Sequence, residues 1–299
     1  MIRLALIAWL ALCGVANAQL SGGLQFPGPG TAHSAGASYT GPGDVAGATA
    51  ATWCGLHAYS NAAIGQNAIR VTRRGDSATS DFATIAGGGL DGAAITSFIT
   101  GGGDTRGEVT ICYDQTGNGK NWTAAAGTAP QIIVSGQGGK PVMRSPNSFG
   151  TPAQLQQTTL SISQPYSIIY SAVRATSSGV EEYAYGDVNV SVVLGGWRTT
   201  ANTAFMSSQT NQNATASDGT FHAFAAIYNG ASSSLVVGSS STSTSPGTNP
   251  IGNSFGIMGA VGQGGMTGDL ESLGIWASDR SATAVAINGT SCTWSSYSC

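Results

Sequence analysis

The chain has 299 residues, only 8% of them charged, against about 25% in an average protein, and its net charge is −3. It has no basic stripe and no acidic tail, which argues against nucleic acids and anionic membranes as partners. The surface must therefore be built mostly from Ser, Thr, Asn, Gln and Gly. Such surfaces suit contact with neutral glycans but are equally common on inert exported proteins.

The first residues, MIRLALIAWLALCGVANAQ, have the pattern of a secretory signal. Arg3 precedes the apolar run Leu4–Leu12, and Ala16–Ala18 supplies the small residues that a signal peptidase needs. The run is too short for a membrane span, and no later stretch is long and apolar enough for one. We therefore expect cleavage near Ala18, removal of residues 1–18, and a secreted protein, either extracellular or periplasmic.

Five cysteines become four once Cys13 leaves with the signal. An even number in an oxidising compartment predicts two disulfides, with three connectivities open. Cys292 and Cys299 are close in sequence, which favours their pairing and leaves Cys54 with Cys112. Because there is no CxxC and no clustered His, we expect neither a metal site nor a cofactor.

The first elements follow a loop-rich lead-in, residues 19–47, which contains PGPG and TGPGD. We expect residues 48–299 to form one domain. Ala48–Ala63 is rich in Ala and has large apolar residues at spacings of three, a pattern that predicts a helix. Ala68–Arg74 alternates as a strand does, and Asp91–Ile99 is a second short helix candidate with Asp91 as its N-cap.

From Glu108 onward the sequence predicts about a dozen short strands separated by Gly, Asn and Ser, and its composition indicates no late helix. Ser239–Ser245 (SSSTSTS) is of low complexity, and we expect a long surface loop there. The predicted fold class is all-β, an antiparallel β-sandwich or jelly roll with one or two short helices near the N-terminus.

The stretch Thr110–Trp122, TICYDQTGNGKNW, is the most distinctive motif. Asp114, Thr116 and Asn118 fit the first half of an EF-hand loop, but Ala125 stands where the bidentate carboxylate is needed. The phosphate-loop pattern is also missing. We therefore predict a Gly/Asn-rich turn in which Asp114 accepts backbone N–H bonds.

A sequence signal for an esterase-type hydrolase fails. A GxSxG occurs at Gly252–Gly256, but a strand-like segment follows it, and all three histidines (His33, His57 and His222) precede Ser254. A nucleophile elbow is thereby excluded. We expect His57 and His222 to be packed or rim residues rather than ligands or bases.

Glycoside hydrolysis needs two facing carboxylates, about 5–5.5 Å or 6.5–9.5 Å apart. The nominated carboxylates are Glu182 and Asp187, with Asp269 and Glu271 as substitutes, although we favour ordinary solvated carboxylates for all four. Glu181 is adjacent to Glu182, so at most one of the two points to a given face. The aromatic residues near Glu182 and Asp187 form a predicted sugar platform, namely Tyr183, Tyr185 and Trp197.

The run Trp53–Ile99, followed by Thr110–Gly127, resembles the catalytic domain of α-L-arabinofuranosidase B, in the family 54 glycoside hydrolases. The matching segments occur in the family's order: Cys54, Tyr59-Ser60, Arg73–Asp76, Gly88–Asp91 and Tyr113–Gly119. The ending, GDLESLGIWASDRSATAVAINGT, resembles the closing strand of lectin-like sandwiches, which leads into a short helix. The resemblance implies a concanavalin-like jelly roll.

The resemblance implies the fold, but the residues that the family uses for catalysis have no match in this chain. The family's substrate pocket has two adjacent cysteines before its FDYGN segment, whereas Glu181–Asp187 (EEYAYGD) has none. The family's nucleophilic Glu and acid/base Asp align with Val190–Val192 and Val261, which carry no carboxylate. We therefore predict a secreted module that binds neutral, for example arabinose-containing, glycans. An active α-L-arabinofuranosidase with relocated carboxylates and a structural surface or appendage protein are the alternatives, and the sequence does not set the oligomeric state.

Overall fold

The computed structural model describes residues 39–103, 105–124, 126–145, 153–187, 193–261 and 264–297. The predicted signal and residues 19–38 of the predicted lead-in lie outside this part. The rest of the lead-in contains the short helix α1 (Pro42–Val45), whose Asp44 accepts the backbone N–H groups of Gly41 and Asn61. No helix within the described ranges is long and apolar enough to cross a membrane.

A central layer of strands is built around β9 (Tyr166–Arg174) and β19 (Gly268–Trp276), which pair antiparallel along most of their lengths. The strands that extend this layer beyond β9 are β14 (His222–Tyr228), β15 (Ser234–Val237) and β16 (Ser240–Ser243). The other edge of β19 pairs with β1 (Thr52–Gly55) at one end and β7 (Val142–Ser145) at the other.

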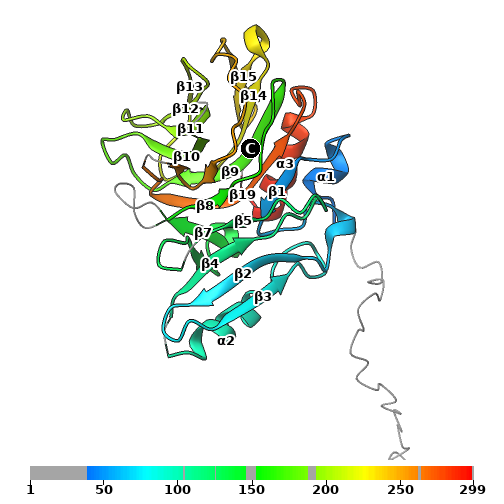
Figure 1. Ribbon diagram of the computed structural model, residues 1–299, viewed down its shortest axis with the longest axis vertical. Helices are drawn as coiled ribbons and strands as arrows, with labels where there is room; N and C mark the ends of the chain where they lie inside the picture. Colours follow the sequence, from blue (N-terminus) through cyan, green and yellow to red (C-terminus); the bar gives the residue numbers. More distant parts are fainter. Residues whose placement is uncertain are drawn as a thin grey trace, which may run out of the picture. The chain divides into compact units, whose positions relative to one another are not determined.

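An arm of strands continues from β7, as Figure 1 shows. It consists of β6 (Gln131–Ile133), β4 (Gly107–Cys112), β2 (Asn67–Arg73) and β3 (Thr79–Ala83). Helix α2 (Gly92–Thr100) packs on this arm with Ile95 and Ile99 buried. Asp91 accepts the N–H of Ala94, so the predicted strand and N-capped helix are both confirmed here.

A second layer connects to the arm through β5 (Trp122–Thr123), which pairs with β4 and β8. Its strands are β8 (Leu155–Gln157), β17 (Phe255–Ile257), β10 (Glu182–Asp187), β11 (Val193–Trp197), β12 (Thr203–Ser207) and β13 (Asn211–Thr215). The short β18 (Ala260–Val261) is parallel to β10, whereas the other named strand pairs among the described residues are antiparallel. The predicted all-β sandwich is confirmed.

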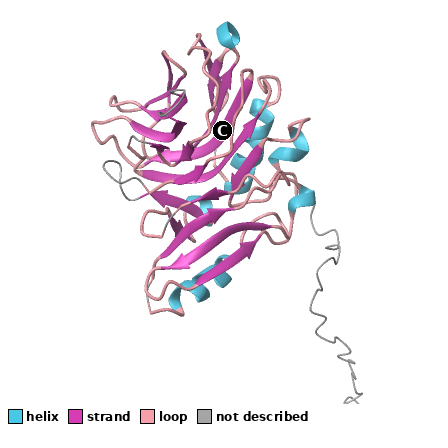
Figure 2. Ribbon diagram, in the orientation of Figure 1, coloured by secondary structure: helices cyan, strands magenta, loops and turns pink. Residues whose placement is uncertain are grey.

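The central layer is buried on both faces. Along β9, Tyr166, Ile168 and Tyr170 enter the main core between the layers, while Ile169 enters a second cluster on the outer face. Helix α3 (Ala284–Ser295) and the segment before β1 cover that outer face, and Figure 2 shows helices on the outside of the strands. This double burial explains why these strands read as nearly continuous apolar runs.

The predicted helix over Ala48–Ala63 is wrong. Residues 52–55 form β1, and the only helical turn in this range is the 3-10 helix η1 (Asn61–Ala63). Trp53 packs in the outer cluster and Leu56 in the main core, so the spacing of three does not mark one helix face. Pairing with the edge of β19 overrides the helix propensity of this Ala-rich segment.

Two further expectations from composition are wrong. Helix α3 is a late helix, as the resemblance to lectin-like endings had implied; it has no side-chain cap at its N-terminus and includes Asn288 and Gly289, which weaken its signal. The Ser239–Ser245 segment contains the strand β16 rather than a plain loop. Because every residue of β16 is exposed, its sequence shows no apolar alternation.

Candidate functional site

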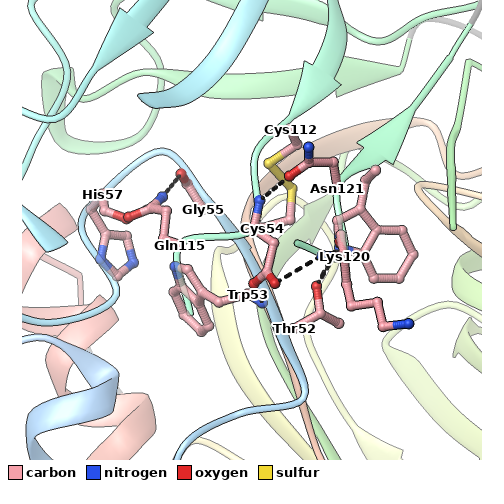
Figure 3. The surroundings of a disulfide bond; sticks show 11 residues. Thr52, Trp53, Cys54, Gly55, His57, Cys112, Gln115, Lys120 and Asn121 are labelled. Atoms are coloured by element: carbon pink, nitrogen blue, oxygen red, sulfur yellow. Dashed lines mark hydrogen bonds between the residues drawn. A yellow bond between two sulfur atoms is a disulfide. The ribbon is translucent and has the colours of Figure 1, made fainter. Parts of the chain in front are cut away.

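A disulfide joins β1 to the arm beside the most distinctive motif. Cys54 and Cys112 are bonded, with Cα atoms 5.5 Å apart, as predicted (Figure 3). Cys292 is also disulfide-bonded, but its predicted partner Cys299 lies outside the described residues, so that pairing stays a prediction.

The turn after Cys112 is structural. Asp114 Oδ1 accepts the N–H of Trp53 at 3.1 Å and both the N–H and the hydroxyl of Thr116, at 3.1 and 2.7 Å. Its Oδ2 accepts the N–H of Lys120 at 3.0 Å. The amide of Gln115 donates to the carbonyl of Gly55 at 2.9 Å. This confirms the predicted backbone contacts of Asp114 and shows a carboxylate fully engaged by the protein itself.

The nominated carboxylate Glu182 also has structural partners. It is fully buried, accepts the hydroxyl of Ser178 at 2.6 Å, and accepts the N–H of Thr267 at 2.5 Å. Its neighbour Glu181 points elsewhere and forms an ion pair with Arg198 at 2.6 Å. Glu182 therefore fixes the chain that enters β19 and does not face a ligand. The expectation that it is an ordinary solvated carboxylate is wrong, because it is fully buried.

Glu271 lies in a buried polar network beneath α3. Its Oε1 is 3.1 Å from His57 Nε2, and its Oε2 accepts the hydroxyl of Ser295 at 2.6 Å. The hydroxyl of Tyr39 is 2.8 Å from His57 Nδ1. The predicted packing role of His57 is confirmed, while His222 is a partly buried residue at the start of β14, with its pKa lowered by burial.

Asp187 occupies a different position. It is buried at the end of β10, where the strand register pairs it with Val193 on one side and Val261 on the other. Val261, aligned with the family's acid/base Asp, is the sheet partner of Asp187. Residues 190–192, aligned with the family's nucleophilic Glu, follow Asp187 closely in sequence but lie outside the described part. Glu182 is five residues away on the same strand, about 16 Å, which is too far for either glycosidase geometry.

The predicted aromatic platform is largely internal. Tyr185 and Trp197 are fully buried, and their rings pack against Phe255 and Phe224, with centroids 5.8 and 5.4 Å apart. These two rings fill the main core because β10 and β11 are covered on that face, so the expectation that they present a ring to a sugar needs correction. Tyr183 lies on the other face of β10 and is 9% exposed.

An open cleft of about 610 Å³ lies where β7, β9 and β19 meet. Arg144 and Ser145 come from β7, Val173 from β9, and Thr267 and Asp269 from the start of β19. The loop Ser135–Gln137 and Gly219 close its sides. The structure thus brings one nominated carboxylate, Asp269, to a surface cleft.

A planar ion pair forms the polar part of this cleft. Arg144 Nε and Nη2 donate to the two oxygens of Asp269 at 2.6 and 2.8 Å. The hydrogen bonds that Arg144 donates to Asp269 raise the pKa of Arg144, so the guanidinium stays charged. The Arg144 side chain is 45% exposed and that of Asp269 12%, and Nη1 of Arg144 takes no part in this pair. A half-exposed donor and a largely buried acceptor therefore lie side by side in the cleft.

Buried charges hold the walls of the cleft in place. Arg174 is fully buried and donates to Asp218 Oδ1 at 2.8 and 2.6 Å, while its carbonyl accepts the N–H of Gly219. Thr267 is held through Glu182 and through its own carbonyl, which accepts the N–H of Ala175. Sequence reasoning missed Arg144 and Arg174. The available signal was a lone charge inside an apolar strand, VMRS and SAVR, on a chain with few charges.

Comparisons with known proteins identify the fold. Neither a protein-family model nor a curated protein sequence matches the chain. A family 54 α-L-arabinofuranosidase with a cyclic sulfate inhibitor is similar in structure, with a TM-score of 0.61 and 14% identity, over 86% of this chain and 66% of that one. A variant of such an enzyme, soaked with 4-nitrophenyl α-L-arabinofuranoside, gives 0.62 and 16% with the same coverage.

A third arabinofuranosidase, complexed with arabinofuranosyl-α-1,2-xylobiose, gives a TM-score of 0.58 and 16% identity, over 83% of this chain and 64% of that one. The chain has the arabinofuranosidase fold. It spans about two thirds of the length of these enzymes.

Proposed function

We propose that this protein is a secreted carbohydrate-recognition protein of arabinofuranosidase-like fold, which binds neutral glycans in the cleft between β7, β9 and β19. The observation that carries the proposal is the Arg144–Asp269 pair, in which a largely buried carboxylate holds a half-exposed guanidinium, on a cleft with preformed walls. Neighbouring hydroxyls of a sugar need a donor and an acceptor at adjacent places, and a fixed guanidinium–carboxylate pair offers both. The arabinofuranosyl-xylobiose in a structure of similar fold supports arabinose-containing glycans as the first ligands to test.

Binding is favoured over hydrolysis by the engagement of the nominated carboxylates. Glu182 and Glu271 are buried with structural partners, and Asp269 is paired with Arg144. The hydrolase alternative depends on Asp187, because its register beside Val261 matches the place of the family's catalytic residues. It needs a second carboxylate within glycosidase distance of Asp187.

Calorimetric titration with arabinan and arabinoxylan oligosaccharides tests the proposal. Arg144→Ala should weaken binding about tenfold or more, since hydrogen bonds to charged groups contribute about 1.5–3 kcal/mol. Arg70→Ala is the matched control, because Arg70 forms a similar bidentate pair with Asp81, at 2.7 and 2.9 Å, and neither residue lines the cleft. Equal loss in both variants would remove the cleft from the proposal, and no binding by the wild type would favour the structural role.

Release of 4-nitrophenol from its α-L-arabinofuranoside tests the alternative. We expect no turnover by the wild type beyond the uncatalysed rate. Turnover that disappears in Asp187→Asn would establish a hydrolase, since losing one catalytic carboxylate removes at least the ~10²–10⁴-fold contribution of acid–base catalysis.

A further inference from the structure

We propose that Trp294 forms an aromatic subsite beside the cleft, on which a further sugar ring of the same neutral glycan stacks after Lys140 moves aside. This inference rests on the proposed function and extends it to longer oligosaccharides. The other tryptophans in the described part of the chain are at most 1% exposed: Trp53, Trp122, Trp197 and Trp276. Trp294, near the end of α3, is only partly buried.

The inner side of the indole is fixed by the buried polar network. The rings of Trp294 and His57 have centroids 4.9 Å apart and are tilted by 32°. His57 is itself held by Glu271 at 3.1 Å and by the hydroxyl of Tyr39 at 2.8 Å. The orientation of Trp294 is therefore set before any ligand arrives, which lowers the entropy cost of using its ring.

A flexible side chain lies over the indole, and Gly89 packs against the ring as well, since a Cβ there would lie 3.2 Å from it. Lys140 Nζ lies over the ring, 5.4 Å from its centroid. An exposed cation–π contact is weak, and a lysine side chain has four rotatable bonds. A sugar ring can displace such an ammonium, because it presents its own C–H groups to the ring while Lys140 regains full hydration.

One short loop connects this ring to the cleft. Residues 135–137 line the cleft, and Lys140 at the other end is drawn back toward them by the bond from Gly136 N–H to the Lys140 carbonyl, 2.8 Å. Gly138 has φ of +57° and lies so close to the backbone of Ser295 that a Cβ would collide with it. Because Ser295 follows Trp294, the same loop contacts both the cleft and the end of α3.

The chemistry of the two places is complementary for a glycan. The Arg144–Asp269 pair can bind hydroxyl groups at the edge of one sugar residue, while an indole face suits the apolar C–H face of another. The proposed ligand is therefore an uncharged oligosaccharide long enough to reach both places. A single sugar would use the cleft alone.

Titrations with an arabinoxylan oligosaccharide series test this. Trp294→Leu should weaken binding of the longest member by about two- to tenfold and leave the shortest unchanged, because only the long ligand reaches the ring. Trp294→Phe should retain most of the affinity, and Lys140→Ala should bind as tightly as the wild type or more tightly. A folded Trp294→Leu variant with unchanged affinity for every length would overturn the inference.

Acrylamide quenching of tryptophan fluorescence gives a second readout. Trp294 should dominate the quenchable emission, and the long oligosaccharide should protect it, whereas the shortest should not. If Arg144→Ala loses binding while Trp294→Leu binds every length as the wild type does and no ligand protects Trp294 from quenching, the subsite is refuted and the proposed function is retained. No binding of any length by the wild type would refute both.

Discussion

The turn around Asp114 and the cleft around Asp269 each centre on a carboxylate, but the two carboxylates differ in the number and the exposure of their partners. In the turn, the carboxylate accepts three backbone N–H groups and one hydroxyl from the protein itself. In the cleft, the carboxylate meets one guanidinium that is 45% exposed. A dense polar motif is therefore not by itself a binding site. A binding site is distinguished by polar groups that remain exposed to solvent once the intramolecular hydrogen bonds of the fold have formed.

The two regions also differ in how they are fixed. The turn is joined to β1 by the Cys54–Cys112 disulfide and by the amide of Gln115. The walls of the cleft are held by the buried Arg174 and Glu182, while the Arg144 side chain remains 45% exposed. Rigid support under accessible groups is what a binding site needs.

The largest expected effect is on the turn. The double variant Cys54→Ala, Cys112→Ala removes a bridge that closes 58 residues of chain, which in the chain-entropy model costs about 4 kcal/mol of stability. Urea unfolding of the variant and the wild type measures this cost. A loss below about 1 kcal/mol would mean that the hydrogen bonds of the turn hold β1 in place without the bridge.

A smaller effect should separate the two carboxylates. Asp114→Ala should cost about 1–3 kcal/mol, because it leaves three part-buried N–H groups without their acceptor, and should leave glycan affinity of the folded protein unchanged. Asp269→Ala is the matched variant, and we expect it to cost less stability than Asp114→Ala while weakening binding, because the Arg144 guanidinium that it leaves is 45% exposed and can be hydrated. Equal stability losses in the two variants would erase the distinction between turn and cleft.

The smallest effect concerns the rim of the turn, where Asp81 bonds both Arg70 and the hydroxyl of Tyr113. The bond from Arg70 lowers the pKa of Asp81 below its ordinary value of 3.8. A lowered folded-state pKa contributes stability above the unfolded-state pKa, and this is lost as pH falls through the folded-state value. Urea midpoints at pH 6 and pH 3 should therefore differ slightly less in Asp81→Asn than in the wild type. An identical difference would show that this exposed pair adds nothing measurable.

Local sequence patterns predicted an element correctly where its structure depends mainly on residues close to it in the chain. The alternation in AIRVTRR predicted β2, and Asp91 predicted the start of α2, because each depends on neighbours within a few residues. The number and spacing of short strand-like segments predicted the all-β class. The Asp114 turn could be predicted because its backbone bonds are partly local.

The tertiary structure decided what depends on distant partners. Whether Ala48–Ala63 becomes a helix or a strand depends on the edge of β19, which lies more than 200 residues further along the chain. Tyr185 and Trp197 became core residues because the second layer folds over the first, a fact that no local spacing records. Arg144 and Asp269 meet across 125 residues. A sequence pattern reports the preferences of neighbouring residues, whereas accessibility, and with it the candidate site, is set by which strands end up covering one another.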